Sequence, residues 1–365
     1  MLEFLNLKPE TFGLDFSDTS LKLVKVEKVL GKQEIVSFSE VFLKPNIIKN
    51  GEIRDKEGLA REIKQLLSSV KGKKLDTNCL VASLPEEKGF LEVIQMPKVL
   101  EKDLGSAVVF EAQNHIPLPM EEVYFDYQTI PISPENQDHQ DILISALPKK
   151  IVDGYVECLK MACLKPLVFE PESLAISRTL IKGGFAPEPV LMIDFGMANT
   201  SFVIFSGHSV RLTFSLPLFP GKITENIARA LGVEIAEARK LKKKYGLGAE
   251  NGKTAEQVSG IIATSFSDFI SQTKKHLDYY YTHVSHEHLS GKNRKIGRAL
   301  IFGGGSGLKG LQRFLANELN LQVEFADPWV NISRDIGAKP ILEEADAIRY
   351  IAALGLALRE PETKI

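Results

Sequence analysis

The amino-acid sequence predicts a two-lobed α/β protein, and three observations support this fold class. The chain has 365 residues, enough for about two domains that each bury a core of their own. Short runs rich in β-branched and aromatic residues alternate with segments whose apolar residues recur at helical spacing. A hairpin pattern near the amino terminus also returns in the second half of the chain, which indicates an internal duplication.

Composition and charge exclude several classes of protein. Hydrophobic residues make up 44% of the chain and charged residues 25%, as in globular proteins and unlike disordered or collagen-like chains. The formal net charge of −2 provides no overall attraction to nucleic acid or to an anionic membrane, so we expect neither as a partner. The three cysteines follow no disulfide-framework spacing, and the sequence contains neither a signal peptide nor an apolar run of about 18 residues, so we expect a cytoplasmic protein.

The first half of the chain is expected to begin with a β-hairpin at residues 12–27. A third strand near 34–43, a helix near 56–70 and a strand at 79–83 follow. The next region, 84–147, differs because prolines recur throughout it and separate one expected helix from two expected strands. We interpret this region as an inserted subdomain.

The second half of the chain repeats the hairpin pattern. In each hairpin an apolar strand ends in an aspartate followed by a small polar turn, and these aspartates, Asp15 and Asp194, lie 179 residues apart (from 15 to 194). A duplication of this length predicts two lobes of similar architecture. We expect the first lobe in residues 1–190, the second in 191–340, and a C-terminal helix within 341–365 that packs back on the first lobe.

The two hairpins and a later glycine turn have the residue types needed to hold a nucleoside triphosphate. Asp15 and Asp194 can orient a hydrated Mg²⁺, because hard cations prefer carboxylate oxygens. The turns after them expose backbone N–H groups and polar side chains to phosphate oxygens. A glycine turn after a strand at 298–302 lets the backbone approach a base or an α-phosphate closely. The candidate contacts are Ser17, Thr19, Ser20 and Lys22 in the first hairpin, Gly196, Asn199 and Thr200 in the second, and Gly303, Gly304 and Gly305 in the glycine turn.

These features resemble the two phosphate motifs and the adenosine motif of the actin, Hsp70 and FtsA superfamily. Within it the chain is similar end to end to the PilM family of type IV pilus biogenesis proteins. The matching stretches are FGLDFSDTSLKLVKVE, VLMIDFGMANTSFVIF, PGKITENIARALGV with the following AEARKLKKKYG, ALIFGGGSGLKGLQRFLANEL and AALGLALRE. The resemblance implies an actin-like ATPase fold, with duplicated ribonuclease H-like lobes and an FtsA-type inserted subdomain at 84–147. It also implies ATP and Mg²⁺ in the cleft between the lobes, with Glu237 and Lys240 near the ribose.

The same resemblance implies a role in pilus assembly. Proteins of this family are cytoplasmic scaffolds that bind the short cytoplasmic N-terminal segment of PilN, in a groove between the first lobe and the inserted subdomain. We therefore expect a PilN-like inner-membrane protein as partner, together with other pilus assembly proteins. Attachment to the inner membrane would then depend on that partner and not on insertion of this chain. Self-association is left open, and any ATPase activity is expected to be weak.

The first phosphate turn departs from the family pattern. The family usually places glycine two residues after the aspartate, whereas this chain has Ser17 followed by Asp18. Without glycine the turn loses easy access to positive φ. The charge of Asp18 would repel a phosphate about 4 Å away by roughly 4 kcal/mol at an effective dielectric constant near 20. We therefore predict weak nucleotide binding, or binding with little turnover.

Several alternative interpretations stay open. Gly305 to Gly310 fits the dinucleotide-binding pattern G-x-G-x-x-G, with Glu324 on the next expected strand, although few residues follow to complete a Rossmann sheet. An FtsA-like division protein, the cytoplasmic part of a type II secretion protein and a scaffold with a vestigial nucleotide site are further alternatives. Two clusters are interpreted as solvated surface, namely His276, His283, His286 and His288, and the basic run Arg239, Lys240, Lys242, Lys243 and Lys244.

Overall fold

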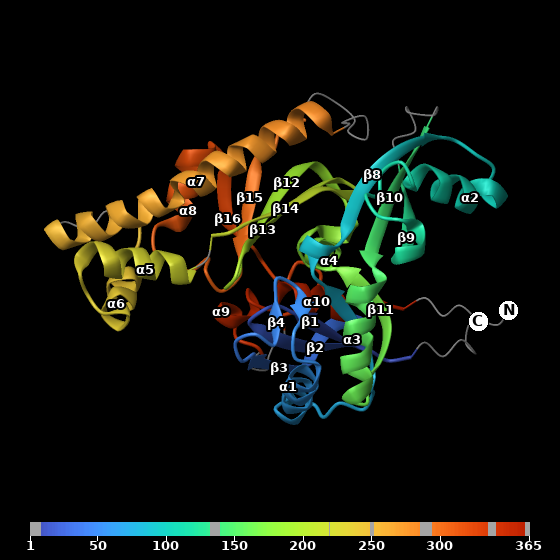
Figure 1. Cartoon of the computed structure of the whole chain (residues 1–365), viewed down its shortest axis with the longest axis horizontal. Helices are drawn as coiled ribbons and strands as arrows, with labels where there is room; N and C mark the ends of the chain where they lie inside the picture. Colours follow the sequence, from blue (N-terminus) through green and yellow to red (C-terminus); the bar gives the residue numbers. More distant parts are fainter. Residues whose placement is uncertain are drawn as a thin grey trace. The chain divides into compact units, whose positions relative to one another are not determined.

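The computed structural model describes residues 9–131, 139–218, 220–248, 252–284, 294–334 and 341–361 (Figure 1). The contacts within the chain divide it into two compact units. The first comprises Met1–Phe185 and Asp327–Ile365, and the second comprises Ala186–Ala326. The chain therefore leaves the first unit after Phe185 and returns to it at Asp327. Among the described residues, no helix combines the length and the apolar character needed to cross a membrane.

A six-stranded sheet in the order β11-β7-β1-β2-β3-β6 forms the centre of the first unit. Strands β1, β2 and β3 are antiparallel neighbours, whereas β1 pairs with β7, and β7 with β11, in parallel. Helices pack on both faces, so β1 is buried along its whole length. The strands are β1 (Phe12–Phe16), β2 (Ser20–Val29), β3 (Lys32–Phe42), β6 (Lys71–Gly72), β7 (Cys79–Leu84) and β11 (Lys165–Pro171), beside a small hairpin of β4 (Ile48–Lys49) and β5 (Glu52–Ile53). The helices are α1 (Lys56–Ser68), α3 (Lys149–Met161), α4 (Glu172–Leu180), α9 (Glu344–Ala347) and α10 (Ile351–Ala357).

The C-terminal helix α10 packs very closely against β1 and α4 of the same unit. A Cβ atom at Gly13 would overlap a backbone carbonyl of α10, and a Cβ atom at Gly355 would overlap the carbonyl oxygen of Ala175. Only glycine permits this approach. Arg178 of α4 strengthens the contact, because it donates to the carbonyl oxygen of Gly355 at 2.8 Å and to both carboxylate oxygens of Glu170 at 2.6 and 2.9 Å.

The segment between β7 and α3 forms a separate small layer within the first unit. Strands β8 (Phe90–Pro97), β9 (Val123–Ile130) and β10 (His139–Pro148) make an antiparallel sheet in the order β8-β10-β9. Helix α2 (Glu101–Ala112) lies over one face of it (Figure 1). Its core is formed by Ile94, Met96, Val108, Ala112, Ile116, Val123, Ile142, Ile144 and Ala146. Strand β8 was not predicted, because the prolines on either side of it are more typical of loops.

The second unit contains a five-stranded sheet in the order β14-β13-β12-β15-β16. Strands β12, β13 and β14 are antiparallel, and β15 and β16 continue from β12 in parallel. This mixed sheet differs from the parallel sheet that a dinucleotide-binding fold requires. The strands are β12 (Ala186–Phe195), β13 (Thr200–Gly207), β14 (Ser209–Leu216), β15 (Arg298–Phe302) and β16 (Gln322–Phe325), and the helices are α5 (Pro220–Leu231), α6 (Ile235–Tyr245), α7 (Lys253–His283) and α8 (Leu311–Leu319).

The predicted internal duplication is confirmed in the register of the two sheets. The order β3-β2-β1-β7-β11 of the first unit corresponds to β14-β13-β12-β15-β16 of the second. Across the hairpins Asp15 pairs with Lys22 and Asp194 pairs with Ser201, so the 179-residue offset also relates the partner positions 22 and 201. In both units the strand that ends in aspartate has a parallel neighbour on its other side.

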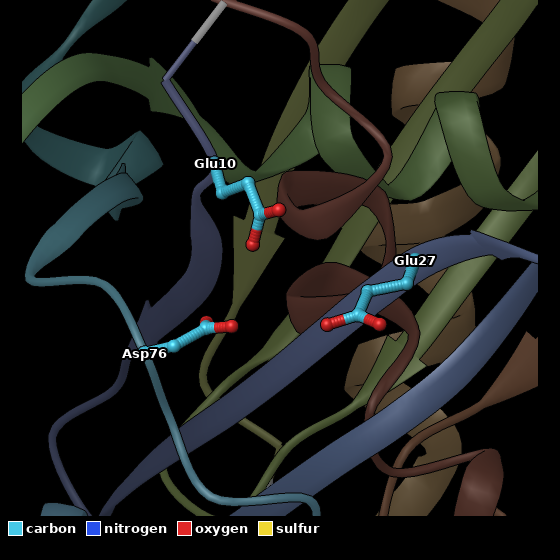
Figure 2. Close-up of side chains that lie close together, drawn as sticks. All are labelled: Glu10, Glu27 and Asp76. Atoms are coloured by element: carbon cyan, nitrogen blue, oxygen red, sulfur yellow. The ribbon is translucent and has the colours of Figure 1, made fainter.

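A buried lysine joins three segments of the first unit. The ammonium of Lys25 on β2 lies 2.8 Å from Glu10 and 2.9 Å from Glu27, also pairs with Asp76, and its side chain is only 1% exposed. Figure 2 shows the three carboxylates around one space, where their oxygens lie within 4.8 Å of one another, close enough for a metal ion. Burial alone would lower the pKa of Lys25, but the hydrogen bonds to Asp76, Glu10 and Glu27 outweigh it and raise the pKa. The lysine thus supplies the cation of this cluster.

Replacing Lys25 with methionine is expected to lower the free energy of unfolding by about 3 kcal/mol, because three neighbouring carboxylates lose the cation between them. The matched control is Lys73→Met, which removes the ion pairs of Lys73 with Glu27 and Asp76. Because the Lys73 side chain is 52% exposed and its ion pairs are screened by solvent, this control should lose much less than Lys25→Met. Urea denaturation at pH 7 measures both losses, and equal losses would contradict the assignment.

The effect of Lys25→Met should also depend on pH. A hydrogen bond from Lys25 lowers the pKa of Asp76, and hydrogen bonds first from Lys73 and then from Lys25 lower the pKa of Glu27. Carboxylates with lowered pKa values stabilise the fold above their ordinary pKa and lose this contribution as the pH falls. The difference between wild type and variant should therefore be largest above pH 5 or so and shrink as the pH falls below about 4, toward the lowered pKa values.

Candidate functional site

In the first unit, Asp15 lies at the end of β1 with both carboxylate oxygens in contact with neighbouring side chains. The hydroxyl of Ser83 donates to Asp15 Oδ1 at 3.0 Å and accepts from the backbone N–H of Phe16 at 2.9 Å. The Lys22 ammonium lies 3.6 Å from Asp15 Oδ2. The parallel pairing of β1 with β7 brings Ser83 to this place, and no local motif in the sequence indicated it. Asp15 is a positioned carboxylate whose charge is balanced by Lys22.

The turn after Asp15 is closed by the side chain of Ser17. Its hydroxyl oxygen accepts from the backbone N–H of Ser20 at 3.0 Å and of Thr19 at 3.4 Å, and its hydroxyl donates to the Ser20 carbonyl at 3.0 Å. Residues 17–19 all have negative φ, so this turn does not need the glycine that the family pattern usually has. Two N–H groups of the turn are consequently used within the turn itself, which leaves fewer of them for a phosphate.

Asp18 is bound to a neighbouring hairpin instead of being an unpartnered charge. Its two carboxylate oxygens accept from the backbone N–H groups of Asn50 at 2.6 Å and Gly51 at 2.9 Å. These residues form the turn between β4 and β5, and their φ values of 50° and 72° are typical of a type I′ turn. The hydroxyl of Tyr155 on α3 donates to the Gly51 carbonyl at 3.0 Å. Asp18 therefore connects the turn after Asp15 to the β4–β5 hairpin and, through that hairpin, to α3.

In the second unit, Asp194 lies against the glycine turn that follows β15. Gly303 has a φ of +83°, and a Cβ atom there would overlap Asp194 Oδ1. The N–H of Gly305 donates to the carbonyl of Phe195 at 2.8 Å, and a Cβ atom at Gly305 would lie only 3.1 Å from Phe195. At Gly304 a Cβ atom would meet nothing within 4 Å. Gly303 and Gly305 thus hold the turn against β12, while Gly304 faces open space.

In the second hairpin turn, the structure leaves two predicted phosphate contacts, Gly196 and Asn199, and assigns Thr200 a different role. At Gly196 a Cβ atom would lie 2.7 Å from the carbonyl oxygen of Asn199, so the turn is too tight for a side chain there. Thr200 was expected to contact phosphate, but it is fully buried and its hydroxyl donates to the Leu218 carbonyl at 2.7 Å. This hydrogen bond links β13 to the segment after β14, so the Thr200 hydroxyl has a structural role. Gly196 and Asn199 remain the candidates of this turn.

A pocket of about 180 Å³ opens beside the glycine turn. Its walls combine apolar side chains with glycine backbone and three lysines. This combination offers surfaces for a flat apolar ring and for an anion. The lining residues, all of the second unit, are Phe195, Leu218, Pro220, Ile223, Lys242, Lys243, Phe266, Gly304, Gly305, Gly307, Leu308 and Lys309.

Helix α6 contributes different residues to this pocket than the sequence suggested. Glu237 and Lys240, expected near a ribose, form an ion pair at 3.6 Å with side chains 50% and 78% exposed, and neither lines the pocket. Lys242 lines it instead, and its ammonium donates to the Pro220 carbonyl and to the Thr224 hydroxyl, both at 2.7 Å. Burial, together with the charge of Arg239, lowers the pKa of Lys242. Helical spacing could have indicated this role of Lys242, because Lys242 follows the buried Ala238 by four residues and so lies on the same face of α6.

The two histidines of the cluster that lie within the described residues, His276 and His283, both stack on aromatic rings. His276 stacks on Phe214 with ring centroids 4.1 Å apart, and burial lowers its pKa. His283 stacks on Tyr279 at 4.5 Å. The other two members, His286 and His288, lie outside the described residues. Within the part of the chain that the structure describes, the only group of side chains close enough to share a metal ion is the carboxylate cluster around Lys25.

Comparison with known proteins agrees with this architecture. The family model of the type IV pilus assembly protein PilM matches residues 13–361. Among solved structures, the PilM-PilN type IV pilus biogenesis complex matches with a TM-score of 0.77 and 24% identity, covering 98% of this chain and 100% of that one.

Two further structures share the fold at lower identity. The ethanolamine utilization protein EutJ from Carboxydothermus hydrogenoformans has a TM-score of 0.53 and 12% identity, covering 96% of this chain and 90% of its own. MreB5 of Spiroplasma citri bound to AMPPNP has a TM-score of 0.52 and 11% identity, covering 94% of each chain. These likenesses confirm the predicted actin-like fold. Since the family match extends over nearly the whole sequence, this chain belongs to the PilM family of type IV pilus assembly proteins.

Proposed function

We propose that this chain is a nucleotide-binding scaffold of type IV pilus assembly, with ATP as the nucleotide. The observation that carries the proposal is the pocket of the second unit. There the exposed backbone of Gly304, apolar walls and the Lys242 ammonium meet at the end of the strand that bears Asp194. An actin-like relative, MreB5, is bound to AMPPNP, which supports a nucleotide as the ligand class.

The proposed contacts follow from the chemistry of each group. The apolar wall with Phe195 and Phe266 suits the base, and the glycine turn with Lys242 suits the α-phosphate and ribose oxygens. Asp194 is the proposed Mg²⁺ contact through water, with Gly196 and Asn199 beside it. Asp15 with its turn, Ser17, Thr19, Ser20 and Lys22, is the proposed contribution of the first unit.

Weak turnover is part of the proposal. Ser17 uses the N–H groups of Thr19 and Ser20 within the first turn, and Asp18 keeps a negative charge beside it. Both features reduce the stabilisation that this turn offers to a phosphate on which charge develops. A scaffold that binds ATP in order to select a conformation has no need of rapid hydrolysis, because a ligand shifts an equilibrium by its differential affinity alone.

The proposed partner is a PilN-like protein of the inner membrane. A solved complex pairs PilM with PilN, and that PilM matches 98% of this chain. We infer that this chain likewise binds the cytoplasmic N-terminal segment of such a protein and is held at the inner membrane through it. A folded receptor that captures an extended segment gains affinity from main-chain pairing and selectivity from side-chain pockets.

Replacing Gly304 with valine is expected to weaken the binding of a fluorescent ATP analogue with Mg²⁺ at least tenfold. The new Cβ atom would have no other atom within 4 Å, so the free energy of unfolding should stay within about 0.5 kcal/mol. The control is Gly260→Ala on α7, another glycine with nothing within 4 Å but outside the pocket lining. Fluorescence anisotropy measures the affinity, and unchanged affinity in Gly304→Val would refute the pocket assignment.

Replacing Asp18 with asparagine is expected to tighten ATP binding by about tenfold, because a like charge beside the phosphates is removed. The same change should lower the free energy of unfolding by about 1 kcal/mol, since the amide leaves one N–H of the β4–β5 turn without an acceptor. The control is Asp55→Asn, which removes the same charge at the N-cap of α1, where asparagine caps equally well. Calorimetric titration measures the ATP affinity of each variant. A lower affinity in Asp18→Asn would contradict the prediction, because it would show that the carboxylate assists binding.

A synthetic peptide of the N-terminal segment of the neighbouring PilN-like protein should bind the full chain saturably. A scrambled peptide of the same composition should not bind, because pairing and pocket contacts depend on residue order. Calorimetric titration of both peptides tests the partner assignment. Absence of saturable binding of the correct peptide, or equal binding of the scrambled one, would contradict the partner assignment.

A further inference from the structure

A fully buried serine, Ser83, lies beside the candidate phosphate contact Asp15. Ser83 is the penultimate residue of β7, as Asp15 is of β1, and the two strands pair in parallel. The second unit has no such hydroxyl at the corresponding place, because the residue that pairs with Asp194 on β15 is Phe302. Ser83 is thus a feature of the first unit that the duplication does not repeat.

The two hydrogen bonds of Ser83 allow its hydroxyl only one orientation. The oxygen accepts from the backbone N–H of Phe16 at 2.9 Å. An ionised carboxylate can only accept, so the single hydrogen of the hydroxyl is donated to Asp15 Oδ1 at 3.0 Å. Asp15 is itself only 5% exposed. One carboxylate oxygen is therefore held by a buried donor, and this contact fixes the direction of the other oxygen, Oδ2.

Lys22 is the cation that faces this second oxygen. It lies opposite Asp15 across the β1–β2 hairpin, with its ammonium 3.6 Å from Asp15 Oδ2 and its side chain 15% exposed. Within the described ranges, the Lys22 ammonium has no other carboxylate at ion-pair distance and no hydrogen bond to a protein atom. Its three N–H donors consequently stay available to an anionic ligand, while the carboxylate keeps the ammonium in place.

We propose that Ser83 is a positioning residue of the nucleotide site. It holds the Asp15 carboxylate, and the carboxylate presents the Lys22 ammonium to the phosphates. The inference rests on the proposed function and sharpens it, because the cation beside Asp15 is then Lys22 and the Mg²⁺ contact is left to Asp194. A divalent ion placed at Asp15 Oδ2 would be repelled by the ammonium.

The phosphates that Lys22 serves follow from the groups of the second unit. The glycine turn with Lys242 suits the α-phosphate, which is the only phosphate of AMP. The first unit is then left with the phosphates that ATP has and AMP lacks. A defect in the position of Lys22 should consequently weaken the binding of ATP and leave the binding of AMP unchanged.

The test measures the affinities of the full-length Ser83→Ala variant for ATP and for AMP by competition with a fluorescent ATP analogue. The affinity for ATP should fall about tenfold, because the hydrogen bond that holds a charged group is lost. The fall should be the same with Mg²⁺ and with EDTA, and the affinity for AMP should not change. An equal loss for AMP would reduce Ser83 to a structural role. A loss confined to Mg²⁺ would assign Asp15 to the metal, and either result would overturn the proposal.

Further variants separate the position of Lys22 from the stability of the sheet. Ser39→Ala removes another buried hydroxyl of the same sheet, which donates to the Leu66 carbonyl at 3.0 Å, and should bind ATP as the wild type does. Ser83→Cys replaces the hydroxyl with a thiol, which forms weaker hydrogen bonds, and should lie between wild type and Ser83→Ala. Wild-type affinity in both Ser83 variants would contradict the proposal.

A double variant tests whether Ser83 acts through Lys22. Ser83→Ala combined with Lys22→Met should bind ATP no more weakly than Lys22→Met alone, because both changes remove the same contact. Additive losses would contradict this route. Failure of the wild type to bind either ATP or AMP would instead refute the nucleotide site itself, so the two claims fail in different ways.

Discussion

The parallel pairing of one strand in each unit determines where the candidate site lies. β1 pairs with β7, and β12 with β15, each next to an antiparallel hairpin. Because the carboxyl ends of parallel strands meet at one edge of a sheet, the aspartate that ends the first strand lies beside whatever follows the second. In the first unit this neighbour is Ser83, and in the second it is Gly303. Asp15 and Asp194, the carboxylates of the proposed nucleotide contacts, lie at these two strand ends.

The strand end that carries the aspartate has different surroundings in the two repeats. In the second unit, Gly303 leaves room for the Asp194 carboxylate, and the next glycine opens a pocket lined by Phe195 and Lys242. In the first unit, a serine hydroxyl holds the carboxylate, and the turn is closed by its own side chains. The first unit instead contributes packing, since the close approach of α10 to β1 fixes the strand that carries Asp15. One repeat thus supplies a pocket, and the other a firmly held charge.

Local patterns in the sequence were enough to predict the hairpins, the duplication and the glycine turn. Alternating apolar residues and a repeated aspartate depend on neighbours within a few positions, so they can be read from one sequence. Ser83 and Lys242 were missed because their roles come from a parallel neighbour and from the buried side of α6. Thr200 was predicted to contact phosphate because it follows the second turn in the sequence. Its actual partner, the Leu218 carbonyl, lies 18 residues away and could not be inferred from the local pattern. The contact of Asp18 with Asn50 has the same origin, a pairing across 32 residues that no motif describes.

Hydrogen exchange with mass spectrometry tests most directly whether these repeated strand ends form the nucleotide site. It would compare the full chain with and without ATP and Mg²⁺, following the amides of residues 15–20, 194–200 and 303–306. The account predicts that all three segments exchange more slowly with nucleotide, while the amides of α2 are unchanged. If none of the three segments exchanged more slowly at millimolar concentrations of ATP and Mg²⁺, the account would be contradicted.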